Sequence, residues 1–196
     1  MIPVETFPFK VSARSHEGRS GKNNEDRYAV SAFKVDEIDE TPSVFAVVAD
    51  GIGGHQAGEV AAEVAVTLIN EEVASSDAAT PIETLRAAIV KAGQVIRDKA
   101  ESEQGKRGMG ATCVCAWVIG DRLYTASVGD SRVYLIRDQD IQQLSTDHTW
   151  VQEAVDAGLL STEQGSNHPN RNIIRRSLGS LESVEVDQDI QLTPDS

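Results

Sequence analysis

The sequence has 196 residues, with 18 basic and 31 acidic side chains and a formal net charge of −13. This charge repels a phosphate backbone, so we expect no nucleic-acid partner. No apolar run reaches the roughly 20 residues of a membrane helix, and residues 1–11 lack the apolar stretch of a signal peptide. We therefore expect a cytoplasmic protein with no membrane partner, forming a single domain over residues 1–196.

The two cysteines, Cys113 and Cys115, stand two residues apart in an apolar run. On a strand both would point to the same face, which makes them neighbours rather than disulfide partners. Two cysteines do not complete a zinc site either. We expect both to be small apolar core residues in a reduced protein.

The first fifty residues alternate between short apolar runs and polar loops. The run at 44–49 is rich in valine and continuously apolar, which predicts a strand buried on both faces. Three glycines within 51–54 predict a sharp turn directly after it. The other segments expected here are strands at 7–13 and 28–33, a loop at 16–26 and an acidic turn at 36–42.

Two adjacent helices are expected next, at 57–74 and 81–101. Thr80 is the candidate N-cap of the second helix, and Pro81 suits its first turn. The apolar stripes follow the three-and-four spacing of a helix. We assign Val60, Val64, Thr67, Leu68 and Glu71 to the first stripe, and Leu85, Ala88, Ile89, Ala92 and Ile96 to the second.

Strands return after a break at 107–110. Runs of strands separated by a run of helices predict an α+β fold in layers. The expected segments are strands at 111–119 and 122–128, a hairpin of 132–136 with 141–144, a helix at 150–157, an irregular stretch at 159–172, a short helix at 172–178 and a last strand at 184–192.

Three acidic clusters stand at predicted strand ends or glycine turns. They are Glu25-Asp26, Asp50-Gly51 and Gly129-Asp130. Strand ends bring carboxylates to the rim of a sheet, and hard divalent cations prefer carboxylate and carbonyl oxygens. Each pair alone is also common in ordinary turns. Only the neighbouring sequence can therefore distinguish a metal site from a simple turn.

Five segments supply those surroundings: SGKNNEDRY, VFAVVADGIGGHQAGEVAAEVA, GMGATC, YTASVGDSRVYLI and LSTDHTW, in this order. Together with GLLSTEQGSNHPNRNIIRRSLG they resemble the type 2C, or PPM-type, serine/threonine protein phosphatases, in their bacterial form. The resemblance implies a four-layer α-β-β-α sandwich with a metal cleft at one edge of two central sheets, and a flap-like segment at 151–178.

The resemblance also implies a role for each acidic cluster. Asp50 matches the aspartate that bridges two metal ions, and Gly51 matches the residue whose carbonyl binds the second ion. Glu25 stands where an acidic residue lies near that ion, and Asp26 matches an aspartate that holds metal-bound water. Asp130 matches the aspartate that binds a third ion. The implied cofactors are two or three Mn²⁺ or Mg²⁺ ions, and the implied partners are phosphorylated proteins.

The implied reaction is hydrolysis of phosphoserine and phosphothreonine by a metal-activated water. Two ions about 3.5–4 Å apart lower the pKa of a shared water, and the resulting hydroxide attacks phosphorus in line. His55, beside the Asp50 turn, is the candidate acid for the leaving oxygen, or else an exposed loop histidine. His148 is expected to hydrogen-bond within its loop, and Arg132 to form an ion pair with Asp130.

Three features depart from the family pattern. The chain ends at Ser196, before the two family aspartates that complete the metal sites, so we expect a fragment of a longer protein with little activity of its own. Gly21 stands where many members carry a phosphate-binding arginine, so Arg19 or Lys22 would have to bind the substrate phosphate. Ile52 stands where other members have methionine or histidine.

Two alternatives remain open at this point. A catalytically impaired pseudophosphatase would keep the fold as a protein-binding module; the incomplete ligand set and Gly21 favour it, and the intact Asp50 and Asp130 turns oppose it. A plain structural cation-binding domain would gain thermal stability from metal without hydrolysing a phosphoester. The sequence does not fix the oligomeric state, for which a monomer is the expectation.

Overall fold

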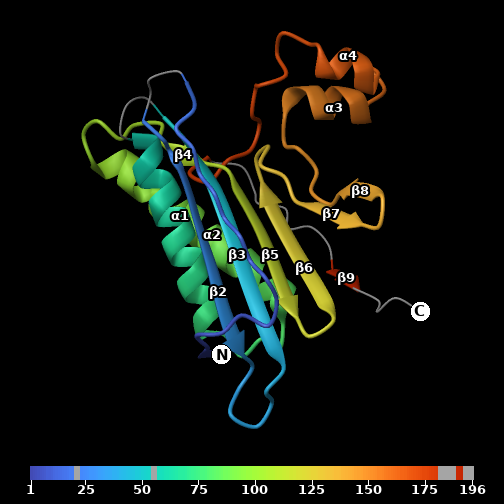
Figure 1. Cartoon of the computed structure of the whole chain (residues 1–196). Coiled ribbons are helices and arrows are strands. Elements are labelled where there is room, and N and C mark those ends of the chain that lie inside the picture. The colour runs from blue at the N-terminus through green and yellow to red at the C-terminus, as the bar shows by residue number, and fades with distance from the viewer. Residues whose placement is uncertain (20–22, 54–56, 181–188, 192–196) are drawn as a thin grey trace.

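A computed structural model describes residues 1–19, 23–53, 57–180 and 189–191 (Figure 1). Its centre is an antiparallel sheet with the strand order β1-β2-β3-β5-β6-β9, in which β4 also pairs with β3. The strands are β1 (Ile2–Pro3), β2 (Asp26–Lys34), β3 (Pro42–Ile52), β4 (Gly110–Ala111), β5 (Cys113–Ile119), β6 (Arg122–Val128) and β9 (Asp189–Gln191). The predicted α+β class is therefore confirmed.

Helices α1 (Ala57–Ser75) and α2 (Pro81–Ser102) cover one face of this sheet (Figure 1). The predicted stripe of α2 is confirmed, because all five of its residues are buried. Pro81 occupies the first turn, but the Thr80 side chain makes no capping hydrogen bond. The predicted stripe of α1 is only partly right, because Val60, Val64 and Leu68 are half-buried against the core whereas Thr67 and Glu71 are exposed. Helix α1 buries mainly small residues, namely Ala57, Gly58, Ala61, Ala62, Ala65, Val66, Ile69 and Val73.

The alanine face of α1 explains that error. Small side chains let a helix lie close against a sheet, so burial follows the alanines and leaves Thr67 and Glu71 in solvent. The two helices and the sheet share one hydrophobic core. At its centre the ring edges of Phe45 and Trp117 meet at a centroid distance of 6.2 Å, and the Trp117 indole donates to Ser43 Oγ at 2.8 Å.

The opposite face of the sheet is more open than predicted. Val48 is 43% exposed and Tyr28 is 45% exposed, so strand 44–49 is not buried on both faces. Of the four layers that the resemblance implies, the described residues form one helical layer and one sheet. A separate hairpin of β7 (Tyr134–Arg137) and β8 (Asp140–Gln143) stands beside them, below α3 (Trp150–Asp156) and α4 (Thr162–Ser166) in Figure 1.

Several predicted boundaries change because of backbone pairing. Residues 7–13 form no strand, and Pro8 within them lacks an amide donor; Ile2–Pro3 pairs with β2 instead. β3 continues through the predicted glycine turn to Ile52, because its end pairs with β4. The predicted strand 111–119 is divided at Thr112.

The C-terminal predictions need further corrections. Residues 172–178 are not helical, because Ile174 and Leu178 form isolated bridges with Thr149 and Ala111. The stretch 159–172 contains α4, which a capping box of Ser161 and Gln164 begins. Of the predicted strand 184–192, only β9 lies within the described residues.

None of the helices in the described ranges combines the length and the apolar character that crossing a membrane requires.

Candidate functional site

The acidic clusters meet at one end of the sheet. The register of β2 and β3 places Asp26 directly opposite Asp50, so both side chains lie on the same face of the sheet. The Gly51 amide donates to the Glu25 carbonyl at 3.3 Å, which ties the start of β2 to the end of β3. The chain thereby brings Glu25 and Asp26, and Asp50 from 24 residues after Asp26, to one rim.

Two glycines permit a close approach between this rim and α1. A Cβ atom added to Gly51 would lie 2.2 Å from the Gly58 carbonyl oxygen. A Cβ atom added to Gly58 would lie 2.8 Å from Glu25 Oε2. Only hydrogen atoms fit in these spaces, so the half-buried Glu25 carboxylate lies against the first turn of α1.

Asp130 reaches the same rim from the end of β6. Gly129 allows the turn because its φ is +103°, and its backbone packs against Thr112. The Gly129 amide donates to His148 Nδ1 at 3.1 Å, and the His148 amide donates to the Gly129 carbonyl at 2.8 Å. This ring bond reaches the turn after β6, 19 residues away in sequence, rather than the loop of His148 itself, where the sequence predicted it. His148 and Thr112 together fix the turn that carries Asp130.

The electrostatics show that the carboxylates influence one another. Burial first, and then the negative charges of Asp26, Asp130 and Glu25 in that order, together raise the pKa of Asp50 to about 6. The pKa of Asp130 is also raised, by burial first and then by Asp147, while Arg132 opposes the shift. Every side chain that shifts the pKa of Asp50 is acidic, so the electrostatic field at Asp50 is negative.

The carboxylates share the rim without forming a compact cluster. Within the described ranges, no three Asp, Glu, His or Cys side chains are arranged so that they would hold one ion between them. Like charges resist closer approach, which fits side chains that lie within electrostatic range but apart.

Arg27 secures the start of β2 beside these acids. Its guanidinium donates to the backbone carbonyls of Asn24 at 3.1 Å and Asp26 at 2.8 Å. It also pairs with Glu63 at 3.0 Å and with Glu59 on α1. Sequence reasoning missed this residue, although an arginine directly after two acidic residues was a visible signal.

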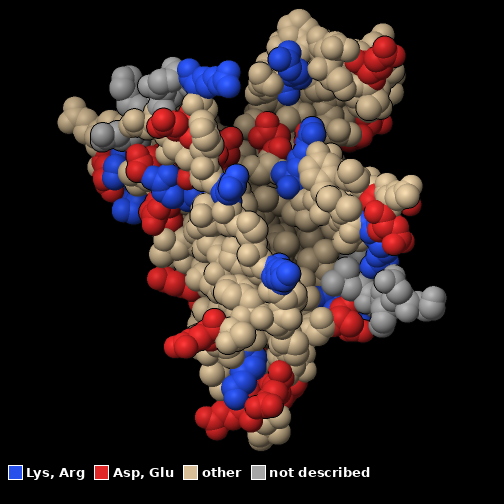
Figure 2. Space-filling view, in the orientation of Figure 1, with Lys and Arg blue, Asp and Glu red and all other residues tan. Residues whose placement is uncertain are grey.

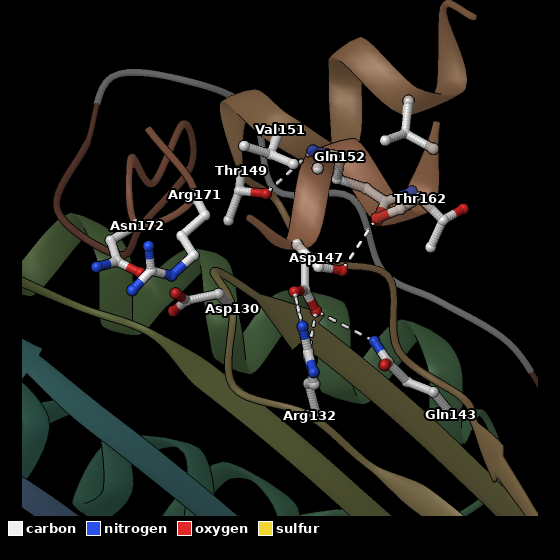
Figure 3. Close-up of a pocket in the computed structure, with 13 residues that line it drawn as sticks. Asp130, Arg132, Gln143, Asp147, Thr149, Val151, Gln152, Thr162, Arg171 and Asn172 are labelled. Atoms are coloured by element: carbon white, nitrogen blue, oxygen red, sulfur yellow. Dashed lines mark hydrogen bonds and ion pairs between the residues drawn. The ribbon is translucent and has the colours of Figure 1, made fainter. Parts of the chain in front are cut away.

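A cleft of about 560 Å³ begins at Asp130 and runs under α3 and α4 (Figure 3). In Figure 2 the surface is hollowed between the lobe that holds these helices and the sheet. The predicted ion pair of Arg132 with Asp130 is wrong. The Arg132 guanidinium instead forks onto Asp147, with Nη2 2.6 Å from Oδ2 and Nε 2.9 Å from Oδ1. This two-pronged contact gives each oxygen of the Asp147 carboxylate a hydrogen-bond donor.

The other candidate residues are less informative. His55 and Lys22 lie outside the described residues, as does Gly21. Arg19 is exposed in the loop before β2. His168, a loop histidine to which the sequence assigns no site role, packs on Trp150 with ring centroids 4.9 Å apart, and its Nδ1 accepts from the Asn170 amide.

Comparison with known proteins gives a consistent result. The family model described as "Protein phosphatase 2C" matches residues 12–154. A serine/threonine phosphatase stp from Listeria welshimeri is 42% identical over 178 residues, which are 89% of this chain and 68% of that protein.

Solved structures agree with the sequence match. Serine/threonine phosphatase Stp1 from Staphylococcus aureus superposes with a TM-score of 0.80 at 28% identity, over 98% of this chain and 74% of the other. The catalytic domain of the serine threonine protein phosphatase PstP, in complex with 2 manganese ions, gives 0.75 at 31% identity, over 92% and 71% of the respective chains.

Proposed function

The chain belongs to the protein phosphatase 2C family, and from that premise we propose that it removes phosphate from phosphoserine and phosphothreonine in proteins. The cofactors of such an enzyme are manganese or magnesium ions. The observation that carries the proposal is the rim where Asp50 is surrounded by the carboxylates of Asp26, Asp130 and Glu25. Several neighbouring carboxylate oxygens are the ligands that a hard divalent cation prefers.

The donor set fits such ions. Asp50, at the centre, would bridge two of them, and the Gly51 carbonyl would bind the second. Glu25 would lie beside that second ion, and Asp26 would hold water bound to it. Asp130, fixed by its own turn, would bind a third. When bound, the ions supply a hydroxide nucleophile near neutral pH and neutralise phosphoryl oxygens.

The remaining chemical tasks fall to side chains around this rim. Protonation of the leaving serine or threonine oxygen needs an acid, and we assign it to His55. Arg19 and Lys22, in the loop before β2, would bind the substrate phosphate as cations. An arginine can do so through two parallel hydrogen bonds, whereas a lysine offers a point charge.

The setting of the enzyme is also a proposal. Cys113 and Cys115 are buried free thiols whose Sγ atoms lie 3.6 Å apart, which supports a reducing cytoplasm. We propose a monomer with one phosphatase domain over residues 1–196, in which 151–178 acts as a flap-like segment. A net charge of −13 supports protein substrates rather than nucleic acid.

The test is hydrolysis of a phosphothreonine peptide with Mn²⁺, using the protein at the full length in which it occurs. Asp50→Asn should lower kcat at least about a hundredfold, because the loss of a negative charge at the centre of the site weakens the binding of the metal ions. Asp121→Asn, in an exposed hairpin turn, is the matched control and should retain wild-type activity. Turnover that Asp50→Asn leaves unchanged would contradict the proposal.

The two alternatives draw no support from the comparisons, in which the named relatives are phosphatases. The same assay addresses both, because a binding module or a structural cation-binding domain would show no Mn²⁺-dependent release of phosphate.

A further inference from the structure

Thr112 makes an irregular pair with Asp50 at the point where β4 ends and β5 begins. The registers of β3 with β4 and with β5 place these two residues opposite each other. The Thr112 amide donates to the Asp50 carbonyl at 2.8 Å, as in a regular antiparallel ladder. The returning bond is different. The Asp50 amide donates to the Thr112 side-chain oxygen Oγ1 at 3.0 Å, where a regular ladder would use the Thr112 carbonyl.

The same hydroxyl reaches the turn that carries Asp130. Thr112 Oγ1 lies 2.6 Å from Ser131 Oγ. A threonine hydroxyl has one proton to donate and lone pairs that accept. Because Oγ1 already accepts from the Asp50 amide, its own proton is available for Ser131. One side-chain oxygen therefore joins the backbone of Asp50 to the residue directly after Asp130.

Packing reinforces this link. Thr112 is fully buried, and a Cβ atom added to Gly129 would lie 2.6 Å from Thr112 Cγ2. The methyl group thus supports the turn from one side while the hydroxyl binds its neighbour, Ser131. Thr112 therefore contacts the strand end at Asp50 through its hydroxyl and the Asp130 turn through both its hydroxyl and its methyl group.

We propose that Thr112 is a positioning residue that sets the distance between the Asp50 and Asp130 turns through its hydroxyl group. Two carboxylates that act on one substrate have to be held to within a fraction of an ångström by groups behind them. The catalytic consequence rests on the proposed function, whereas the hydrogen-bond arrangement does not. The hydroxyl, rather than the size of the side chain, is the group that matters.

Two substitutions of Thr112 distinguish the effect of its hydroxyl group from the effect of its side-chain shape. Thr112→Val keeps the volume and removes the hydroxyl, and Thr112→Ser keeps the hydroxyl and removes the methyl. We expect Thr112→Val to speed hydrogen exchange at the Asp50 amide about tenfold, because that amide loses its acceptor. Mn²⁺ binding by calorimetry should weaken about tenfold, and kcat should fall by a similar factor with KM within about twofold. Thr112→Ser should stay within about threefold of wild type in each measurement.

The outcomes keep the inference distinct from the proposed function. Thr112→Val with wild-type exchange and Mn²⁺ affinity would overturn it, as would equal losses in the valine and serine variants. If Thr112→Val does not fold, Ser131→Ala cuts the same link from the other side, and it should weaken Mn²⁺ binding about threefold. An unchanged affinity in Ser131→Ala would then reject the role. Absence of phosphopeptide hydrolysis by the wild type contradicts the proposed function alone, since hydrogen exchange still tests Thr112.

Discussion

Asp26 and Asp50 lie directly opposite each other across β2 and β3, on the same face at one end of the sheet. Like charges in this position destabilise a strand pair. Partial burial, and then this pairing with Asp26, raise the pKa of Asp50 to about 6. The rim that serves the proposed chemistry is therefore a place where the metal-free fold is under electrostatic strain.

The first prediction concerns the stability of the metal-free protein as a function of pH. The pKa of Asp50 is raised from 3.8 in the unfolded chain to about 6 in the fold, so the folded state binds the proton more tightly. The stabilisation is complete below about pH 4 and is lost as the pH rises through about 6. Asp50→Asn removes the charge and should raise stability at pH 7.5 by about 1 kcal/mol, reduced for solvent screening at this exposed side chain.

Urea unfolding in EDTA at pH 4 and pH 7.5 measures this effect. The gain of Asp50→Asn should disappear at pH 4, where the wild-type carboxyl is protonated as well. Asp121→Asn serves as control and should show no such pH-dependent gain. An equal gain for Asp50→Asn at both pH values would show that charge is not its source.

The second prediction compares one substitution at two helical glycines. Gly58→Ala would place a Cβ atom 2.8 Å from Glu25 Oε2 and 2.9 Å from the Gly51 carbonyl carbon. Gly93→Ala, within α2, would meet nothing closer than 3.7 Å. We expect Gly58→Ala to destabilise the fold by about 1–3 kcal/mol through overpacking. Gly93→Ala should stabilise it by about 0.5–1 kcal/mol through helix propensity.

Thermal unfolding of both variants provides the measurement. Gly58→Ala should also weaken Mn²⁺ binding, because it displaces Glu25 from the rim, whereas Gly93→Ala should leave that binding at the wild-type level. A Gly58→Ala variant at least as stable as the wild type would show that the close approach of α1 to β3 is not as tight as described.

The sequence predicted much of this fold because several segments carry strong local signals. The stripe of α2 combines isoleucine and leucine at helical spacing, and 122–128 is bounded by turns at both ends, so both elements were placed well. The stripe of α1 was only partly right, because alanine carries little apolar signal although half of the buried residues of α1 are alanines.

Other features depend on partners that are distant in sequence. Residues 172–178 have a helical pattern but pair with Thr149 and Ala111, and tertiary pairing overrides local propensity. The acidic motifs did indicate that Glu25, Asp26, Asp50 and Asp130 would lie near one another. The motif GMGATC was visible too, but nothing local shows that the Thr112 hydroxyl would replace a carbonyl in the ladder with Asp50.

The third prediction concerns the fork between Arg132 and Asp147. The Asp147 side chain is only 10% exposed, whereas Arg132 is 46% exposed. Arg132→Ala would leave a nearly buried carboxylate with fewer partners, and it should destabilise the fold by about 1 kcal/mol after allowance for solvent screening. Arg132→Lys should recover only part of this, because lysine cannot donate to both oxygens at once.

A double-mutant cycle with Asp147→Asn makes the measurement specific. The neutral amide needs no counter-charge, so Arg132→Ala should cost much less in the Asp147→Asn background. Additive effects in urea unfolding would mean that the two side chains do not stabilise each other in solution.

The fourth prediction concerns Arg27, which holds the segment before β2 through two backbone carbonyls and ties it to α1. Arg27→Ala should weaken Mn²⁺ binding several-fold, because Asp26 and Glu25 lose their fixed position. The matched control is Lys91→Ala, which breaks another ion pair to a glutamate of α1, Glu72, and touches nothing at the rim. The ion pairs of the half-buried Arg27 and of Lys91 lie near the surface and should each contribute at most about 1 kcal/mol to stability, so unfolding will hardly distinguish the two variants. Calorimetric titration should show weaker Mn²⁺ binding by Arg27→Ala than by Lys91→Ala. Equal Mn²⁺ affinities of the two variants would show that Arg27 does not help to position the acidic residues.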